Sequence, residues 1–244
     1  MILYVGWRRN RNLKSVKRGL KQISKNEWDR IKKLSRPISD RLVELGWWNN
    51  KCYWRKGGTD GCSSQKTWWG RLQEIPYDRD IFKTSKTRFG LGENPVAYLS
   101  NDFVVNCCEV IAQLKNKKAL PWSTLNDYLS GRTHKKSKKY WYPISVKVKS
   151  GALILDLINE SVAFLDIVLL LGGWSNRKEL LDEVILNRNS NAYPATQEIS
   201  ATAFENGFDA VCYQSVRAPT DVMMPDRNLV VFNRTKVTYE KCDQ

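Results

Sequence analysis

A single histidine, His134, occurs in the 244-residue sequence, and it lies in a lysine-rich stretch at residues 131–139. Ser-His-Asp and Cys-His arrangements need an imidazole as general base, so one histidine in such surroundings excludes most schemes of this kind. The signatures GxGxxG, GxxxxGKS/T, HExxH and GxSxG are also absent, which removes the commonest nucleotide-binding and hydrolase motifs. The side chains that remain for chemistry are those of Arg, Tyr, Glu and Ser.

Paired cysteines are missing as well. The six cysteines, at positions 52, 62, 107, 108, 212 and 242, form no CxxC pair and have no disulfide-like spacing. This pattern predicts reduced thiols in a cytoplasmic protein. A zinc site formed by Cys52, Cys62 and His134 is a weak alternative, and we expect no metal.

Long apolar runs are also lacking. The longest, residues 162–171, contains Asp166 and is about half of the ~20 residues that a membrane-spanning helix needs. The apolar start MILYVGW is short and is followed, rather than preceded, by Arg8 and Arg9, unlike a secretory signal. We therefore expect no contact with a membrane.

Charge is abundant but unevenly distributed. The chain carries a net charge of +15, of which residues 1–66 hold +12 and residues 67–244 hold +3. Seven of the ten tryptophans lie at or before Trp69. We predict a basic, Trp-rich helical front section at residues 1–66, followed by a main domain at residues 67–244.

The front section leaves three interpretations open. Cations with interleaved aromatic rings suit a nucleic-acid surface, because cations bind phosphates and rings stack on bases. Alternatively, a helical layer packs its tryptophans inward and exposes its lysines to solvent. A third interpretation is a docking surface for an acidic partner protein. The charge pattern alone does not separate these interpretations.

Apolar spacings of three and four residues predict helix over residues 12–34. Ser24-x-x-Glu27 resembles a capping box, which predicts a second helix that starts there and ends before Pro37. A further short helix is expected at residues 38–45, followed by an aromatic, basic loop at residues 47–65. Strands are expected near residues 95–100, 141–149, 153–158, 208–213 and 228–232, and helices near 103–114, 123–129, 178–186 and 197–205. Because these elements mix without regular βαβ repeats, we predict an α+β fold.

The segment at residues 87–114 contains the strongest candidates for a site. It is expected to form a turn with Arg88, a strand with Tyr98, and a helix capped by Asn101-Asp102. Glu109 is the only charge in that apolar helix, and such a carboxylate is costly unless it is paired or functional. The alternatives are a surface cation at position 88, a core residue at 98 and a solvated carboxylate at 109.

This set of side chains suits cleavage of an N-glycosidic bond in a substrate that carries phosphate. Arginine binds phosphate as a planar fork, and an aromatic ring stacks on a base. A carboxylate stabilises an oxocarbenium-like centre or orients the attacking group. In NAD the nicotinamide leaves a cation as a neutral molecule, so no strong general acid is required.

The segment TRFGLGENPVAYLSNDFVVNCCEVIAQL resembles the core of the RES-domain family, which is named for an Arg, a Glu and a Ser. In that family an Arg-aromatic pair follows a turn, a Tyr lies in an apolar strand, and a Glu lies in the next helix. Arg88-Phe89, Tyr98 and Glu109 fall at this spacing. Thr87 stands where the family usually has Gly, and Gly90 where Asn is frequent.

Two further stretches extend the resemblance over roughly residues 67–234. ATAFENGFDAVCYQSVR followed by RNLVVF is similar to the family's helix, strand and Ser segment, with Ser215 as the third name residue. WGRLQE is similar to the opening strand and places Arg71 at its arginine.

The resemblance implies an ADP-ribosyltransferase-like mixed sheet with flanking helices and an enzyme that cleaves the nicotinamide–ribose bond of NAD by hydrolysis or phosphorolysis. It also implies a toxin with a neutralising antitoxin or regulatory partner. Arg88 would bind the phosphates or the nicotinamide ribose, Tyr98 the nicotinamide end, and Glu109 would be the catalytic carboxylate. Ser215 would hydrogen-bond the substrate, and Arg71 would be a second anion contact.

The predicted catalytic residues are Arg88, Tyr98 and Glu109, and the predicted NAD-binding residues are Arg71, Arg88, Phe89, Tyr98, Ser215 and Arg217. Two other functions remain as alternatives. A protein ADP-ribosyltransferase would use a side chain as acceptor in place of water or phosphate. A non-enzymatic protein would bind nucleic acid through residues 1–66.

Overall fold

The structure is a computed structural model of the chain. It describes residues 13–49, 55–56, 81–85, 87–102, 105–106, 108–109, 139–140, 144–158, 180–187, 192–217 and 227–241. Among the residues singled out above, Arg71, His134, Cys52 and Cys62 lie outside this described part. The same holds for the helix expected at residues 123–129.

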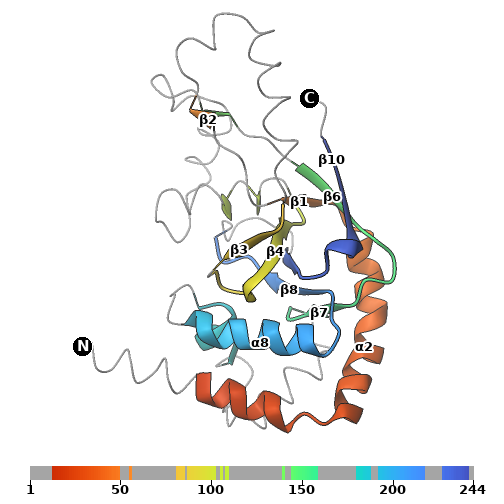
Figure 1. Ribbon diagram of the computed structural model, residues 1–244, viewed down its shortest axis with the longest axis vertical. Helices are drawn as coiled ribbons and strands as arrows, with labels where there is room; N and C mark the ends of the chain where they lie inside the picture. Colours follow the sequence, from red (N-terminus) through yellow and green to blue (C-terminus); the bar gives the residue numbers. More distant parts are fainter. Residues whose placement is uncertain are drawn as a thin grey trace, which may run out of the picture.

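One mixed sheet forms the centre of the fold (Figure 1), in the order β10-β6-β1-β4-β9-β8-β7, with β3 paired to β4. Its strands are β1 (Trp47–Asn49), β3 (Lys83–Ser85), β4 (Gly92–Ser100), β6 (Ile144–Val148), β7 (Ile154–Asp156), β8 (Ala210–Gln214), β9 (Arg227–Val231) and β10 (Val237–Lys241). Among the described strands of this sheet, only β7 and β8 pair in parallel, and the other pairs are antiparallel. Strands β2 (Arg55–Lys56) and β5 (Lys139–Tyr140) form a separate pair. The predicted α+β class, with helices before a mixed sheet, is confirmed.

Strand β4 is longer than the apolar run that predicted it. It begins at Gly92 and passes through Pro95, which was expected to open the strand. The pairing of β4 with β3 shifts register between Lys83, opposite Val96, and Ser85, opposite Gly92. Proline lacks an N–H for the ladder and is tolerated at such irregularities, which explains how the strand continues through it.

Helix α2 (Lys25–Val43) begins at the predicted capping box. The Glu27 N–H donates to Ser24 Oγ at 3.3 Å, and the Ser24 N–H donates to Glu27 Oε2 at 2.7 Å. The expected end before Pro37 is wrong, because the helix continues through this residue and includes most of the short helix expected at 38–45. Ser39 lies beyond the proline and ties the helix to β7: its Oγ accepts from the Ile154 N–H at 2.8 Å. Tertiary packing therefore overrides the local preference of proline.

The parallel pair β7–β8 is joined through a crossover that contains a π-helix, Leu181–Ile185, and helix α8 (Tyr193–Glu205). A parallel pair needs such a crossover. Helix α8 starts before the predicted residue 197, with Pro194 in its first turn, and Gly207 follows it with φ +80°. Glycine accommodates this left-handed conformation, and the expected end of the helix at residue 205 is confirmed.

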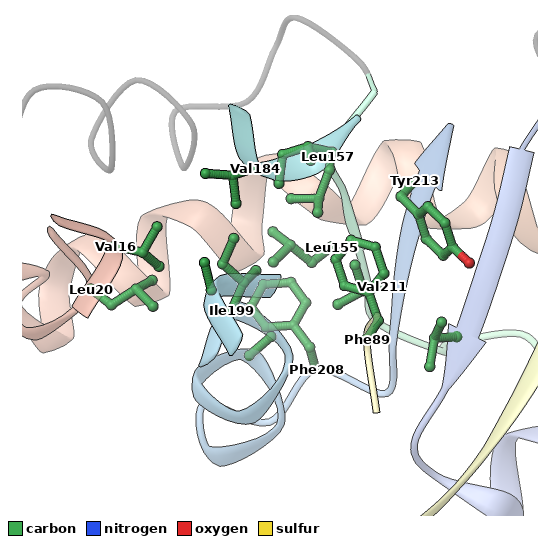
Figure 2. Close-up of a cluster of buried hydrophobic side chains, with 14 of the residues drawn as sticks. Val16, Leu20, Phe89, Leu155, Leu157, Val184, Ile199, Phe208, Val211 and Tyr213 are labelled. Carbon is green, nitrogen blue, oxygen red and sulfur yellow. The ribbon is translucent and has the colours of Figure 1, made fainter. Parts of the chain in front are cut away.

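Helices cover one face of the sheet, and the apolar cluster beneath them is shown in Figure 2. Val16 and Leu20 come from the helix at residues 13–22, Ile199 from α8, and Leu155 and Val211 from the strands. The side chains of alternate strand residues, including Leu99, Ile154 and Leu229, form a second cluster with Trp47. This alternation follows from the two-residue period of a strand.

The beginning of the described chain is part of this same core. Strand β1 pairs with both β4 and β6, so the loop expected from residue 47 is wrong at residues 47–49. Trp28 and Trp47 are 5 % and 0 % exposed, which fits the interpretation of a helical layer that packs its tryptophans inward. The Lys17 Nζ lies 3.4 Å from Glu198 Oε2 of α8. The functional division of the chain at residue 66 stays a prediction.

Among the described residues, no helix is both long and apolar enough to cross a bilayer.

We expect Trp47→Ala to lower the free energy of unfolding by about 3–5 kcal/mol, the usual cost of removing a large buried aromatic side chain. Trp47 is fully buried, and its Nε1 donates to the Leu42 carbonyl at 3.0 Å. The neighbouring Trp48 is only partly buried, so Trp48→Ala is the matched control and should cost clearly less. Urea denaturation of both variants measures the difference. Equal losses would contradict the placement of β1 inside the sheet.

Candidate active site

Three neighbouring strands align polar side chains on the helix-covered face of the sheet. Ser100 of β4 is opposite Asn228 of β9, and Asn228 is opposite Tyr213 of β8. Two residues further along each strand, the next row on the same face consists of Tyr98, Val230 and Val211. Tyr98 packs against the apolar cluster on this face, which also includes Val211 and Val230. The polar row therefore borders the apolar core directly.

Glu109 reaches this row from the helical segment that follows β4. Asp102 Oδ1 accepts from the Val105 N–H at 3.3 Å, which supports the predicted helix cap. Glu109 Oε1 accepts two hydrogen bonds, from Ser215 Oγ at 2.7 Å and from Asn228 Nδ2 at 2.8 Å. The side chain is 15 % exposed, so the carboxylate is shielded but not sealed from solvent.

Arg217 lies on the other side of this carboxylate. Its Nε is 3.5 Å from Glu109 Oε2, and its NH1 donates to the Glu109 backbone carbonyl at 2.9 Å. The Arg217 N–H donates to Ser215 Oγ at 3.3 Å, which leaves the Ser215 hydroxyl proton directed at Glu109. Glu109, Ser215 and Arg217 thus form one connected hydrogen-bonded group, which fixes the carboxylate.

Arg88 is buried close to this group. The residue is only 7 % exposed, and within the described part of the chain its guanidinium has no hydrogen bond or ion pair. Burial lowers the pKa of Arg88, and the nearby Glu109 charge acts in the opposite direction. A buried cation without a protein partner is costly, so this arrangement is typical of a site for an anionic ligand.

The turn that carries Arg88 is held from two sides. From α8, Thr196 Oγ1 donates to the Arg88 carbonyl, and Gln197 Nε2 donates to the Thr87 carbonyl at 2.8 Å. From β4, the Tyr98 hydroxyl accepts from the Phe89 N–H at 3.1 Å and bonds to Thr87 Oγ1. These contacts fix the backbone from which the guanidinium extends.

Phe89 and Tyr213 form the boundary between the apolar core and the polar row. Their ring centroids are 4.3 Å apart, and in Figure 2 the Tyr213 hydroxyl points away from the apolar cluster. Burial, and then the charge of Glu109, raise the pKa of Tyr213, so this hydroxyl stays neutral at physiological pH. The two rings fill the space beside Arg88 with apolar surface.

The predicted residues therefore have the following positions. Ser215 and Arg217 contact Glu109 directly, and the charge of Glu109 acts on Arg88. Tyr98 bonds to the turn of residues 87–89, Phe89 packs on Tyr213, and Arg71 lies outside the described residues. The substrate contacts expected of these residues stay predictions.

Sequence reasoning missed Asn228, Ser100, Thr196 and Tyr213. Asn228 and Tyr213 lie inside the stretches that carried the resemblance, RNLVVF and AVCYQS, but among apolar residues that draw attention to packing. Asn228 stands out only in the structure, where it is a polar side chain of β9 that is 0 % exposed. Burial of this kind depends on strand register, which the sequence alone did not provide.

Metal binding has no support within the described ranges, because they contain no group of three or more His, Cys, Asp or Glu side chains that could hold an ion.

A comparison with protein-family models finds one match, to the RES domain, over residues 65–243. Comparisons with curated proteins and with solved structures find no match. The family match covers most of the chain and includes every residue of the site described above. On this ground, together with the hydrogen-bonded Glu109 and Ser215 beside a buried Arg88, the chain belongs to the RES domain family.

Proposed function

We propose that this protein cleaves the nicotinamide–ribose bond of NAD, with water or inorganic phosphate as the acceptor. RES domains are known in NAD-degrading toxins, which makes an NAD-related activity the natural starting point. The observation that carries the proposal is the Glu109 carboxylate, fixed by Ser215, Asn228 and Arg217, whose charge acts on a buried Arg88 that has no ion-pair partner among the described residues. A dinucleotide has both features that such a site needs: a pyrophosphate for a cation and a ribose that becomes positive when its bond breaks.

The reaction follows from these charges. When the bond between the ribose C1 and the nicotinamide nitrogen breaks, its electron pair moves to the ring nitrogen and nicotinamide leaves as a neutral molecule. The ribose carbon becomes oxocarbenium-like, and the Glu109 carboxylate stabilises that positive charge. Water then adds to C1 and releases a proton, giving ADP-ribose, or a phosphate oxygen adds and gives the 1-phosphate of ADP-ribose.

Arg88 would hold the pyrophosphate or the hydroxyls of the nicotinamide ribose. Its guanidinium offers several N–H donors in a plane, and the described part of the chain occupies none of them. The hydrogen bonds of Thr196, Gln197 and Tyr98 to its turn position the guanidinium before the substrate arrives. Preorganisation of this kind is a large part of electrostatic catalysis.

The protein ADP-ribosyltransferase alternative breaks the same bond and differs only in the acceptor. In that case label from NAD would appear on a macromolecule rather than on free ADP-ribose. The nucleic-acid alternative loses part of its basis, because Trp28 and Trp47 are buried and cannot stack on bases. A cytoplasmic toxin that depletes NAD and is restrained by a partner protein remains our prediction for the role in cells.

We expect the purified protein to release nicotinamide from NAD, and Glu109→Gln to lower kcat by about 10²–10³-fold, the usual cost of removing one preorganised electrostatic contact. Glu93→Gln is the matched control, because Glu93 is exposed at the other end of β4, and it should retain full activity. Chromatography of the products with and without inorganic phosphate identifies the acceptor. No release of nicotinamide under either condition would disprove the proposal.

Replacement of Arg88 should separate activity from stability. We expect Arg88→Met to lower kcat/KM for NAD by about 10–100-fold, the cost of charge-assisted hydrogen bonds to the substrate. The same variant should keep or raise the free energy of unfolding, by about 1 kcal/mol, because it removes a buried cation that no described residue pairs with. Arg30→Met, at an exposed position of α2, should change neither quantity. Steady-state kinetics and urea denaturation measure both effects; a strongly destabilised Arg88→Met with normal kinetics would assign the residue a structural role.

A further inference from the structure

Two buried polar side chains lie behind Glu109, and neither contacts the substrate in the reaction as proposed. Ser100 and Asn228 are each 0 % exposed and lie opposite each other on β4 and β9. The residues next to them in sequence, Leu99 and Leu229, belong to the apolar core. A polar pair in such surroundings lowers stability unless its hydrogen-bonding groups are satisfied. The contacts of the pair therefore indicate what it does.

The orientation of the Asn228 amide follows from the chemistry of its partners. An ionised carboxylate only accepts hydrogen bonds, so the amide must present its NH2 group to Glu109, at 2.8 Å. The amide oxygen then faces Ser100, whose hydroxyl donates to it at 2.7 Å. With its proton committed to Asn228, Ser100 prevents the amide from rotating. Ser100 and Asn228 thus form a chain of two hydrogen bonds, which we call the relay: Ser100 donates to Asn228, and Asn228 donates to Glu109.

The relay makes the two oxygens of Glu109 different. Oε1 accepts from both Asn228 and Ser215. Oε2 has one described neighbour of opposite charge, the Arg217 Nε at 3.5 Å. Lone pairs on Oε2 are therefore available to a further ligand, whereas those on Oε1 are directed at fixed donors.

We propose that Asn228, held by Ser100, is a positioning residue that fixes Glu109 Oε1 and leaves Oε2 as the oxygen that meets the reacting ribose. The inference rests on the proposed function, because it concerns the same carboxylate. With Oε1 held by two fixed donors, the carboxylate does not rotate freely, so Oε2 keeps one orientation in the site. The charged groups beside Glu109 are Arg88 and Arg217, and the neighbouring Tyr213 hydroxyl is neutral.

The first test measures Glu109 itself and needs no catalytic activity. Carbon-13 NMR of labelled glutamate carboxyl groups, assigned with Glu109→Gln, gives the carboxyl chemical shift of Glu109. We expect Asn228→Ala and Ser100→Ala each to change this chemical shift, because a hydrogen bond to the carboxylate is lost or loosened. Ser100→Ala removes only one hydroxyl and serves if Asn228→Ala fails to fold.

Asn233 supplies the matched control. Its Nδ2 donates to Asp209 Oδ1 at 2.7 Å, the same type of bond, but at the opposite ends of β8 and β9. Asn233→Ala should leave the carboxyl chemical shift of Glu109 unchanged. If this chemical shift is also unchanged in folded Asn228→Ala and Ser100→Ala, the relay has no influence on the carboxylate and the proposal is wrong.

The second test uses turnover. We expect Asn228→Ala to lower kcat about 10–100-fold with KM changed by less than about threefold, because a positioning residue acts on the reacting geometry rather than on binding. Asn228→Asp places a second carboxylate 2.8 Å from the first. Because two such groups resist joint ionisation, the acidic limb of its pH–rate profile should move up by about one to two units.

The outcomes distinguish this inference from the proposed function. A wild-type protein that does not cleave NAD would refute the function, and the carboxyl chemical shift would still decide whether the relay acts on Glu109. An active wild type whose Asn228→Asp variant keeps the same pH–rate profile would refute the relay alone. A loss of thermal stability without a change in the chemical shift of Glu109 or in the pH–rate profile would give Asn228 and Ser100 a packing role only.

Discussion

The register of β4, β9 and β8 is the constraint on which the site depends. Ser100, Asn228 and Tyr213 form one row because these strands pair at fixed positions. Since side chains alternate between the two faces, a slip by one residue would turn Asn228 to the opposite face and bring Leu229 to its place. The apolar clusters on both faces resist such a slip, because it would bury polar groups and expose leucines and valines. Packing of the core therefore fixes the geometry of the polar site.

The site also shows how stability is given up for binding. Arg88 is nearly buried and its guanidinium has no partner among the described residues, while Glu109 has two donors on Oε1 and the Arg217 cation beside Oε2. The fold compensates around Arg88 rather than at it: Thr196, Gln197 and Tyr98 satisfy the backbone of the turn. A rigid backbone with an unsatisfied cation is suited to receive an anion without rearranging.

Sequence patterns predicted the parts of the fold that depend on local chemistry. The capping box at Ser24, the cap at Asp102 and the glycine after α8 lie where expected, because each is defined by a few adjacent residues. The apolar surroundings of Glu109 singled out this carboxylate, and the resemblance to the RES-domain family added Ser215, with which it shares a hydrogen bond. These features need no knowledge of distant contacts.

The features that were missed depend on tertiary contacts. Helix α2 passes Pro37 because Ser39 is bound to the backbone of Ile154, more than a hundred residues away in sequence. Trp47 forms a strand because β4 and β6 lie on either side of it. Asn228 is recognisable as polar, but only strand pairing shows that it is buried against Ser100. No local pattern carries this information.

The crossover between β7 and β8 has a consequence for synthesis on the ribosome. The turn of Arg88 is held by residues 196 and 197, and Glu109 is held by residues 215, 217 and 228, all more than a hundred residues further along the chain. A nascent chain that already contains the arginine and the glutamate still lacks the groups that orient them. Because long-range strand pairing forms late and at a high entropic cost, the site is assembled only after residue 228 has been synthesised. Translation products that stop before this residue therefore lack the complete site.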